Sequence, residues 1–326
     1  IRLLLHLVAE SLGGTLQRES GIADDTHYLE HKLFESEDGD AFERYAATGA
    51  SANAFTSFDR TTYLFTCTGD VRPSLDILLD FVQHPYFTEQ TVQKEQGIIG
   101  QEIKMCNDSP ARCVFLNMLE GLYHTHPVRI DIAGTVASIA EITPELLYGC
   151  YRSFYNLHNM VLAVSGRVTV EQVLEIADKR LRPAADWSLA RKTYDEPRTA
   201  LRTRVEQAMP VAAPLFYLGF KDAVAPGEYP SPTREMAADV LLDLIGGRSS
   251  ALYARLMEQG LINQSFGAEY FSAPEKEVNP DGKSIQFFSR PLDAARERSQ
   301  PRGSGDNGLS RKRPVRYGDV APLKGL

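Results

Sequence analysis

The chain has 326 residues, a formal net charge of -8, 43% hydrophobic residues and 24% charged residues. This length allows two domains of ordinary size with packed cores, and the negative charge argues against a general nucleic-acid binder. No apolar run approaches the roughly 20 residues that a membrane-spanning helix needs, so we expect no membrane span. The four cysteines form no C-x-x-C pair, which favours a reducing compartment, the cytoplasm, over a disulfide framework.

The first distinctive pattern follows an atypical N-terminal segment, residues 1–20, that makes a poor signal peptide. His27-Tyr-Leu-Glu30-His31 reads H-x-x-E-H, the inverted zinc-protease signature. Positions i, i+3 and i+4 share one face of a helix, so two imidazoles and a carboxylate would converge there. Imidazoles bind zinc, and a neighbouring carboxylate can take a proton from metal-bound water. The alternative is a surface helix with scattered His and Glu.

Hydrophobic periodicity predicts alternating strands and helices after this motif. Residues 51–58 and 61–66 are rich in β-forming residues and predict two strands around a turn at 59–60. Thr88 is a candidate cap for a long helix that ends near residue 105. The remaining elements of this half are helices at 74–83, 144–155 and 170–181 and a buried strand at 160–165.

The second half repeats the order of elements. A polar stretch at 186–204 is typical of a linker, and a strand at 215–222 and a helix at 239–245 follow it. These two elements echo 63–70 and 76–82, so we interpret the chain as two copies of one αβ unit. From residue 279 onward Gly, Pro, Ser and Arg dominate, which predicts a disordered tail.

A catalytic zinc site needs a third protein ligand and an open position for water. The helix that begins after Thr88 carries Glu95 and Glu102, which are two turns apart and share a face. Gly97 and Gly100 in the same helix each cost about 1 kcal/mol relative to alanine. We expect them to allow a close approach to the His27–His31 helix. Two imidazoles and one carboxylate would leave zinc positive enough to lower the pKa of bound water to about 7.

Three motifs stand in order along the first half of the chain: H-Y-L-E-H-K-L-F-E from His27, G-A-S-A-N-A-F-T-S-F from Gly49, and K-E-Q-G-I-I-G-Q-E-I from Lys94. Together they resemble the pitrilysin/insulinase family of zinc metallopeptidases, and bacterial members related to processing peptidases most of all. The resemblance runs from about residue 21 to 275. It includes H-P-V-R-I-D-I-A-G-T from His126 and G-R-S-S-A-L-Y-A-R-L from Gly247.

The resemblance implies a zinc site with one ion per chain. His27, His31 and Glu102 would be the ligands, and Glu30 would be the general base. Glu95 would be a carboxylate that supports the ligands. A solvated helix position is the alternative for Glu102.

The resemblance also implies a substrate strand, because residues 51–58 match the family's N-A-x-T edge strand. A peptide or unfolded-protein substrate would add to this strand through backbone hydrogen bonds. The alternative for Asn53 is a turn or cap. The residues implied in substrate binding are Ser51, Asn53, Ala54, Phe55 and Thr56.

The match fails in the second half and at both ends. Family members carry an Arg and a Tyr seven residues apart, but residues 256–263 hold neither, and Arg255 and Tyr270 are out of register. The chain would therefore either lack half of a complete site or borrow that half from a homologous partner subunit or a second copy, since family members commonly pair two αβ units across a cleft. The family's strands ahead of the zinc helix are not recognisable in residues 1–20. A truncated or frame-disrupted coding sequence would explain both ends.

We therefore predict an α+β fold with two tandem αβ units, each a mixed sheet flanked by helices, the first lacking its N-terminal strands and the second truncated. The predicted function is a zinc metalloendopeptidase for peptides or small unfolded proteins. The competing hypothesis is a catalytically impaired subunit or remnant that binds zinc and peptide. The predicted segments are 1–20 (atypical), 21–185 (zinc-binding domain), 186–204 (linker), 205–278 (partial second domain) and 279–326 (disordered tail).

Overall fold

The computed structural model describes residues 2–7, 22–58, 60–185, 194–222, 231–272 and 284–291. Most of the predicted N-terminal segment and tail, and residues 186–193 of the predicted linker, lie outside these ranges. The strands are β1 (Arg2–Leu7), β2 (Glu35–Ser36), β3 (Gly39–Asp40), β4 (Ser51–Thr56), β5 (Thr61–Thr66), β6 (Met160–Ser165), β7 (Leu215–Lys221), β8 (Gly267–Ser272) and β9 (Ser284–Pro291). The helices are α1 (Ile22–Leu33), α2 (Ala41–Thr48), α3 (Val71–Phe81), α4 (Glu89–Asn107), α5 (Pro110–Leu122), α6 (Val136–Ile139), α7 (Pro144–Phe154), α8 (Val170–Arg180), α9 (Pro232–Gly246) and α10 (Ala251–Glu258), with 3-10 turns η1 (Pro127–Arg129) and η2 (Leu157–Asn159).

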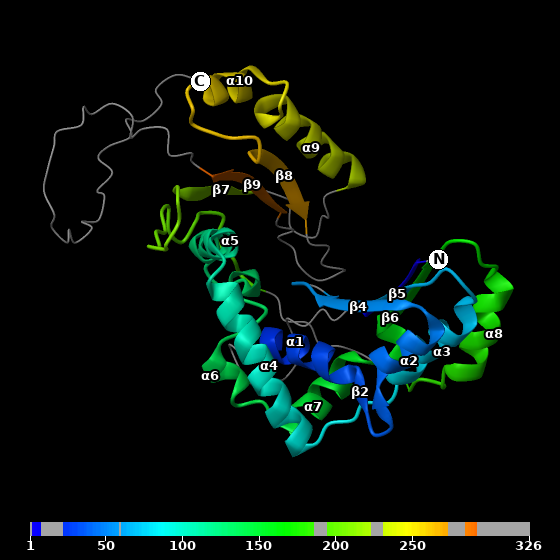
Figure 1. Cartoon of the computed structure of the whole chain (residues 1–326). Coiled ribbons are helices and arrows are strands. Elements are labelled where there is room, and N and C mark those ends of the chain that lie inside the picture. Colours follow the sequence, from blue (N-terminus) through cyan, green and yellow to red (C-terminus); the bar gives the residue numbers. More distant parts are fainter. Residues whose placement is uncertain are drawn as a thin grey trace, which may run out of the picture. The chain divides into compact units, whose positions relative to one another are not determined.

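The first sheet has the strand order β4-β5-β1-β6, and every pair in it is antiparallel. β4 and β5 form the hairpin that the sequence predicts, with Thr56 opposite Thr61 beside the turn. β1 then lies between β5 and β6, with Arg2 opposite both Thr66 and Ser165. Helices α1, α2 and α3 cover one face of this sheet, and α7 packs on α1 (Figure 1).

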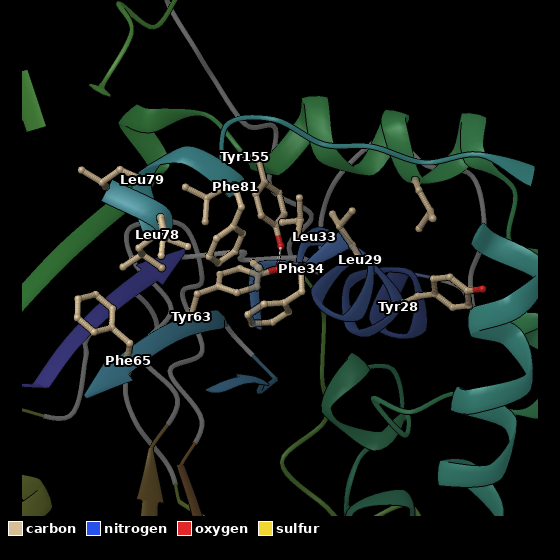
Figure 2. Packing of buried hydrophobic residues seen from close by; sticks show 14 of the residues in the cluster. Tyr28, Leu29, Leu33, Phe34, Tyr63, Phe65, Leu78, Leu79, Phe81 and Tyr155 are labelled. Carbon is tan, nitrogen blue, oxygen red and sulfur yellow. Dashed lines mark hydrogen bonds between the residues drawn. The ribbon is translucent and has the colours of Figure 1, made fainter. Parts of the chain in front are cut away.

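The core of this unit lies between the sheet and α1. Leu29 and Leu33 of α1 are 0% and 1% exposed and point into a cluster of aromatic and aliphatic side chains (Figure 2). Within that cluster the hydroxyl groups of Tyr63 and Tyr155 are hydrogen-bonded at 2.8 Å. On the α4 side of the same cluster, Tyr28 donates to the carbonyl oxygen of Val92 at 2.5 Å. Because α1 is fixed from both sides, its remaining face is held in one orientation.

Helix α4 begins as the sequence predicts, because Thr88 caps it. Its hydroxyl accepts a hydrogen bond from the amide of Thr91, and the Thr91 side chain accepts from the Thr88 amide. The expectation for the two glycines of α4 is wrong, however. A Cβ on Gly97 would meet nothing within 4 Å, and one on Gly100 would meet only Ile139 at 3.9 Å. Neither glycine is required for α4 to approach α1, because side chains bridge the space between the two helices.

The second sheet has the strand order β7-β9-β8 and packs through β7 on α5. The approach is close at Gly219, where a Cβ would lie 2.7 Å from side-chain atoms of both Leu122 and Met118. Beside it, Lys221 of β7 and Glu196 form an ion pair at 2.7 Å, with side chains 4% and 0% exposed. The predicted linker therefore contributes a buried charge, which its polar composition did not indicate.

The mixed α and β fold with two αβ units is confirmed, but three details differ from the expectation. The described strand pairs are all antiparallel rather than mixed; in the first sheet β1 separates β5 from β6, which run in the same direction. β1 lies in the segment where no strand is recognisable in the sequence, because its leucine-rich run lacks the polar–apolar alternation that marks a half-buried strand. β9 lies within the predicted disordered tail, where Ile285-Gln-Phe-Phe288 is locally rich in β-forming residues.

Candidate metal centre

The face of α1 that the core leaves free carries His27, Glu30 and His31. The three positions are i, i+3 and i+4 of one helix, so they lie on one side of it. Tyr28 and Leu29, which are fully buried, prevent the helix from rotating about its axis. The two imidazole rings lie 4.8 Å apart, edge to face.

Helix α4 brings two carboxylates to this face. Nε2 of His27 lies 3.6 Å from Oε1 of Glu102, and Nε2 of His31 lies 3.4 Å from Oε2 of the same carboxylate. One ligand atom from each of the three residues lies within 4.8 Å of the others. Oε1 of Glu95, two turns earlier on α4, lies 3.1 Å from Nδ1, the other ring nitrogen of His31.

These residues fit a zinc ion. Ligand atoms at about 2.0 to 2.2 Å from a tetrahedral zinc lie about 3.3 to 3.6 Å apart. The two nitrogen–oxygen separations at Glu102 are of this size, each to a different carboxylate oxygen, and one ligand atom from each of the three residues lies within 4.8 Å of the others. Two imidazoles and one carboxylate are also a donor set of catalytic zinc sites, which keep a fourth position open. His27, His31 and Glu102 would therefore hold the ion.

Glu95 sets the chemical form of His31. The Nδ1–H group of His31 donates to the Glu95 carboxylate, so in the neutral ring the lone pair is on Nε2, which faces the candidate ligand position. Burial lowers the pKa of His31, but its hydrogen bonds with Glu102 and Glu95 outweigh burial and raise the pKa to about 9. The same contacts with His27 and His31 hold the pKa of Glu102 far below its usual range.

Glu30 lies in the same cavity and is 8% exposed. Burial raises the pKa of Glu30, because the charged carboxylate loses its hydration in the cavity, and a hydrogen bond from Thr56 opposes this rise. The hydroxyl of Thr56 donates to Oε2 of Glu30 at 2.5 Å. A buried carboxylate with a raised pKa, next to a metal site, is suited to accept a proton near neutral pH.

The cavity has a volume of about 880 Å³ and is lined by α1, the β2–β3 hairpin, α2, β4 and α4. The structure brings all four residues of the predicted zinc site together there with Glu95. It also brings Asn53, Ala54, Phe55 and Thr56 of the predicted substrate strand, whereas Ser51, at the far end of β4, does not line the cavity.

The cavity wall includes residues that sequence reasoning did not assign. Phe34 stacks on Phe42 with ring centroids 4.3 Å apart, and Ile98 adds an exposed apolar side chain from α4. Phe34 follows the last residue of α1, three positions after His31, so an aromatic residue next to the motif is the sequence signal for this wall. Acidic groups and one lysine line the rest: Glu35, Glu37, Asp40, Glu43 and Lys94.

The second half holds no Arg–Tyr pair in register with the family pattern. Arg255 lies exposed near the end of α10. The hydroxyl of Tyr270 donates to Asp222 at 3.0 Å, and Asp222 also pairs with Arg234 at 2.9 Å. Tyr270 therefore serves an ion-pair network of its own unit. Among the helices that the structure describes, none combines the length and the apolar character needed to cross a membrane.

Two segments of the sequence, which together make up most of its length, match domains of peptidase family M16. Residues 17–136 match "Insulinase (Peptidase family M16)" and residues 141–278 match "Peptidase M16 inactive domain". The domain boundaries at 185 and 205 remain predictions.

Individual relatives agree with these matches. The uncharacterized zinc protease YmfH of Bacillus subtilis is 44% identical over 255 residues, which is 75% of this chain and 58% of the relative. A mitochondrial-processing peptidase subunit beta of Arabidopsis thaliana, named as probable, is 28% identical over 47% of this chain and 30% of its own length. The crystal structure of an M16-like peptidase from Alicyclobacillus acidocaldarius superposes with a TM-score of 0.76 at 34% identity and covers 90% of this chain and 69% of that one.

The chain spans 58% of the length of its relative from Bacillus subtilis. Both the family matches and the fold confirm the resemblance seen in the sequence. The chain belongs to the insulinase family of peptidases, family M16.

Proposed function

We propose that the chain is a zinc-dependent endopeptidase that hydrolyses peptides or small unfolded proteins, with one zinc ion per chain. The observation that carries the proposal is the convergence of His27, His31 and Glu102 on one point, with the buried Glu30 beside it. The names of the relatives as zinc proteases support it.

Zinc, when bound, supplies Lewis-acid chemistry that polarises a carbonyl group and makes hydroxide available near neutral pH. Glu30 takes the proton of the attacking water and later delivers it to the leaving amine. Its burial favours this role, because a raised pKa brings the carboxyl group closer to the pH at which it works. Glu95 holds His31 in the tautomer that leaves Nε2 available.

The substrate would bind along β4. Within the described residues β4 is an edge strand, paired only with β5, so its outer backbone groups are open to a further strand. Asn53 to Thr56 border the cavity. A peptide that adds to this edge would be held by its backbone, whatever its sequence, and would pass beside Glu30.

A second candidate is a subunit that binds zinc and peptide but turns over poorly by itself. Residues 141–278 match a domain described as inactive, and the second half lacks the Arg–Tyr pair in register. One relative is named as a subunit of a processing peptidase. A homologous partner subunit, or a second copy of the chain, would then complete the substrate-binding side.

A paired experiment separates the two candidates. Wild type, Glu30→Gln and Glu145→Gln are compared for zinc content by mass spectrometry and for cleavage of fluorescein-labelled casein. Glu145 is exposed on α7 and serves as the matched control. A peptidase requires about one zinc in all three proteins and loss of cleavage in Glu30→Gln alone. Zinc in all three without cleavage in any supports the binding subunit, and absence of zinc from the wild type contradicts both candidates.

A further inference from the structure

The strand that would bind substrate also holds the general base. Thr56, the last residue of β4, donates its hydroxyl proton to Oε2 of Glu30 at 2.5 Å. Glu30 is 8% exposed, so water has little access to replace this bond. A buried carboxylate that loses a hydrogen-bond donor changes both its energy and its preferred position.

Thr56 is itself oriented by a second hydroxyl. Oγ1 of Thr56 lies 3.2 Å from Oγ1 of Thr61, its partner across the β4–β5 hairpin. A hydroxyl has one proton to donate and two lone pairs to accept. Because the proton of Thr56 goes to Glu30, the Thr61 hydroxyl is the donor in the Thr56–Thr61 pair. Thr61 is 0% exposed, and hydrogen bonds in such a chain strengthen one another.

The alternation of β4 explains why Thr56 can reach α1. Ser51, Asn53 and Phe55 are exposed, whereas the side chains between them are partly buried and Thr56 continues that inner row. Side chains on one strand alternate between the two faces of the sheet. The backbone of Thr56 therefore belongs to the edge where a peptide would add, while its side chain contacts the helix that carries the site.

We propose that Thr56 is a positioning residue for Glu30: its hydroxyl, oriented by Thr61, fixes one carboxylate oxygen and leaves the other for proton transfer. This inference rests on the proposed peptidase function. It makes the hairpin β4–β5 part of the catalytic apparatus as well as of the binding edge.

The test compares four variants of the full, zinc-loaded chain with the wild type. Thr56→Val removes the hydroxyl at constant shape, Thr56→Ser keeps it, and Thr61→Val removes only the second donor. Thr66→Val is the control, because Thr66 is an exposed threonine at the other end of the same hairpin. The measurements are kcat and KM with fluorescein-labelled casein, zinc content, the thermal unfolding midpoint, and crystal structures of the wild type and Thr56→Val.

Thr56→Val should lower kcat about 10- to 100-fold, the usual range for a residue that orients an active-site group, with KM and zinc content unchanged. Thr61→Val should have a smaller effect of the same kind, and Thr56→Ser should recover most of the activity. Equal kcat values for Thr56→Val and Thr66→Val would overturn the inference, and so would a loss of activity in Thr56→Val that Thr56→Ser does not restore.

The crystal structures keep this result separate from the peptidase proposal. If the wild type binds zinc without cleaving, the peptidase proposal fails. The inference about Thr56 then stands only if the Glu30 carboxylate moves in Thr56→Val, and an unmoved carboxylate overturns it at any level of activity.

Discussion

The buried ion pair between Glu196 and Lys221 should make a large contribution to stability, and Glu196→Gln tests it. The Glu196 carboxylate accepts from the backbone amides of His124, Thr125 and His126 at 2.7 to 2.8 Å, besides the Lys221 ammonium group. Lys221 also donates to two backbone carbonyl groups of the 194–199 segment and lies 4.8 Å from the centre of the Tyr123 ring. The pair thus ties β7 and the 194–199 segment to the end of α5.

The magnitude follows from the pKa of Glu196. Burial raises this pKa, but the hydrogen bonds from Lys221 and from the three amides outweigh it and lower the pKa from 4.5 to about 2. This difference corresponds to about 3 kcal/mol at 1.36 kcal/mol per pKa unit. Since the folded pKa lies below the unfolded one, the stabilisation is fully present above about pH 5 and is lost as the pH falls toward 2.

Urea unfolding followed by circular dichroism at pH 7, 5 and 3 measures the effect. At pH 7, Glu196→Gln should lower the free energy of unfolding by about 3 kcal/mol, because it leaves Lys221 buried without its counter-charge. Its stability should also change less between pH 5 and 3 than that of the wild type. The control is Glu206→Gln, which breaks an exposed pair with Arg204 and should cost less than about 1 kcal/mol. Equal losses in the two variants, or an unchanged pH dependence in Glu196→Gln, would refute the reasoning.

Three further predictions concern the metal site and the backbone. Because the pKa of His31 without metal is about 9, zinc binding at pH 7 should release a proton from this ring, and the apparent zinc affinity should fall about tenfold from pH 7 to pH 6. Calorimetric titrations in buffers of different protonation enthalpy measure the proton release and the affinity. Zinc binding without proton release would contradict the raised pKa. Gly97→Ala should stabilise the chain by about 1 kcal/mol in urea unfolding, since the added Cβ meets nothing and α4 gains helix propensity; a loss of stability would mean that the position is packed. Gly134→Ala should destabilise by about 1 to 3 kcal/mol in the same assay, because Gly134 has φ +69° and a Cβ there would lie 2.5 Å from Cβ of Asp24; an unchanged midpoint would show that this contact relaxes freely.

The zinc helix and its partner helix could be predicted from sequence because their signals are local. The spacing of His27, Glu30 and His31 defines a face within one turn, and Thr88 marks where α4 starts. The seven-residue spacing of Glu95 and Glu102 then places both on one side of α4. Whether that side faces α1 depends on tertiary packing, which the sequence alone does not specify.

The features that sequence reasoning missed depend on contacts between distant segments. The bond between Thr56 and Glu30 links residues on a strand and a helix, and nothing in either local pattern marks it. Glu196 looks like an ordinary charge in a polar stretch until β7 supplies Lys221. The cost of Gly97 and Gly100 to helix α4 predicts a close contact at these positions, but a Cβ there would meet at most Ile139 at 3.9 Å.

The central position of β1 governs the order in which the first sheet can form. β1 pairs with residues 61–66 on one side and with residues 160–165 on the other, so both of its ladders are non-local. During synthesis the β4–β5 hairpin can form early, but the sheet stays incomplete until Ser165 has left the ribosome. Such pairings between distant segments slow folding and expose strand edges meanwhile. The helices that carry the zinc ligands are synthesised before that moment, but α1 packs on this sheet. A metal site of fixed geometry is therefore a late product of folding, available only after the whole first unit has been made.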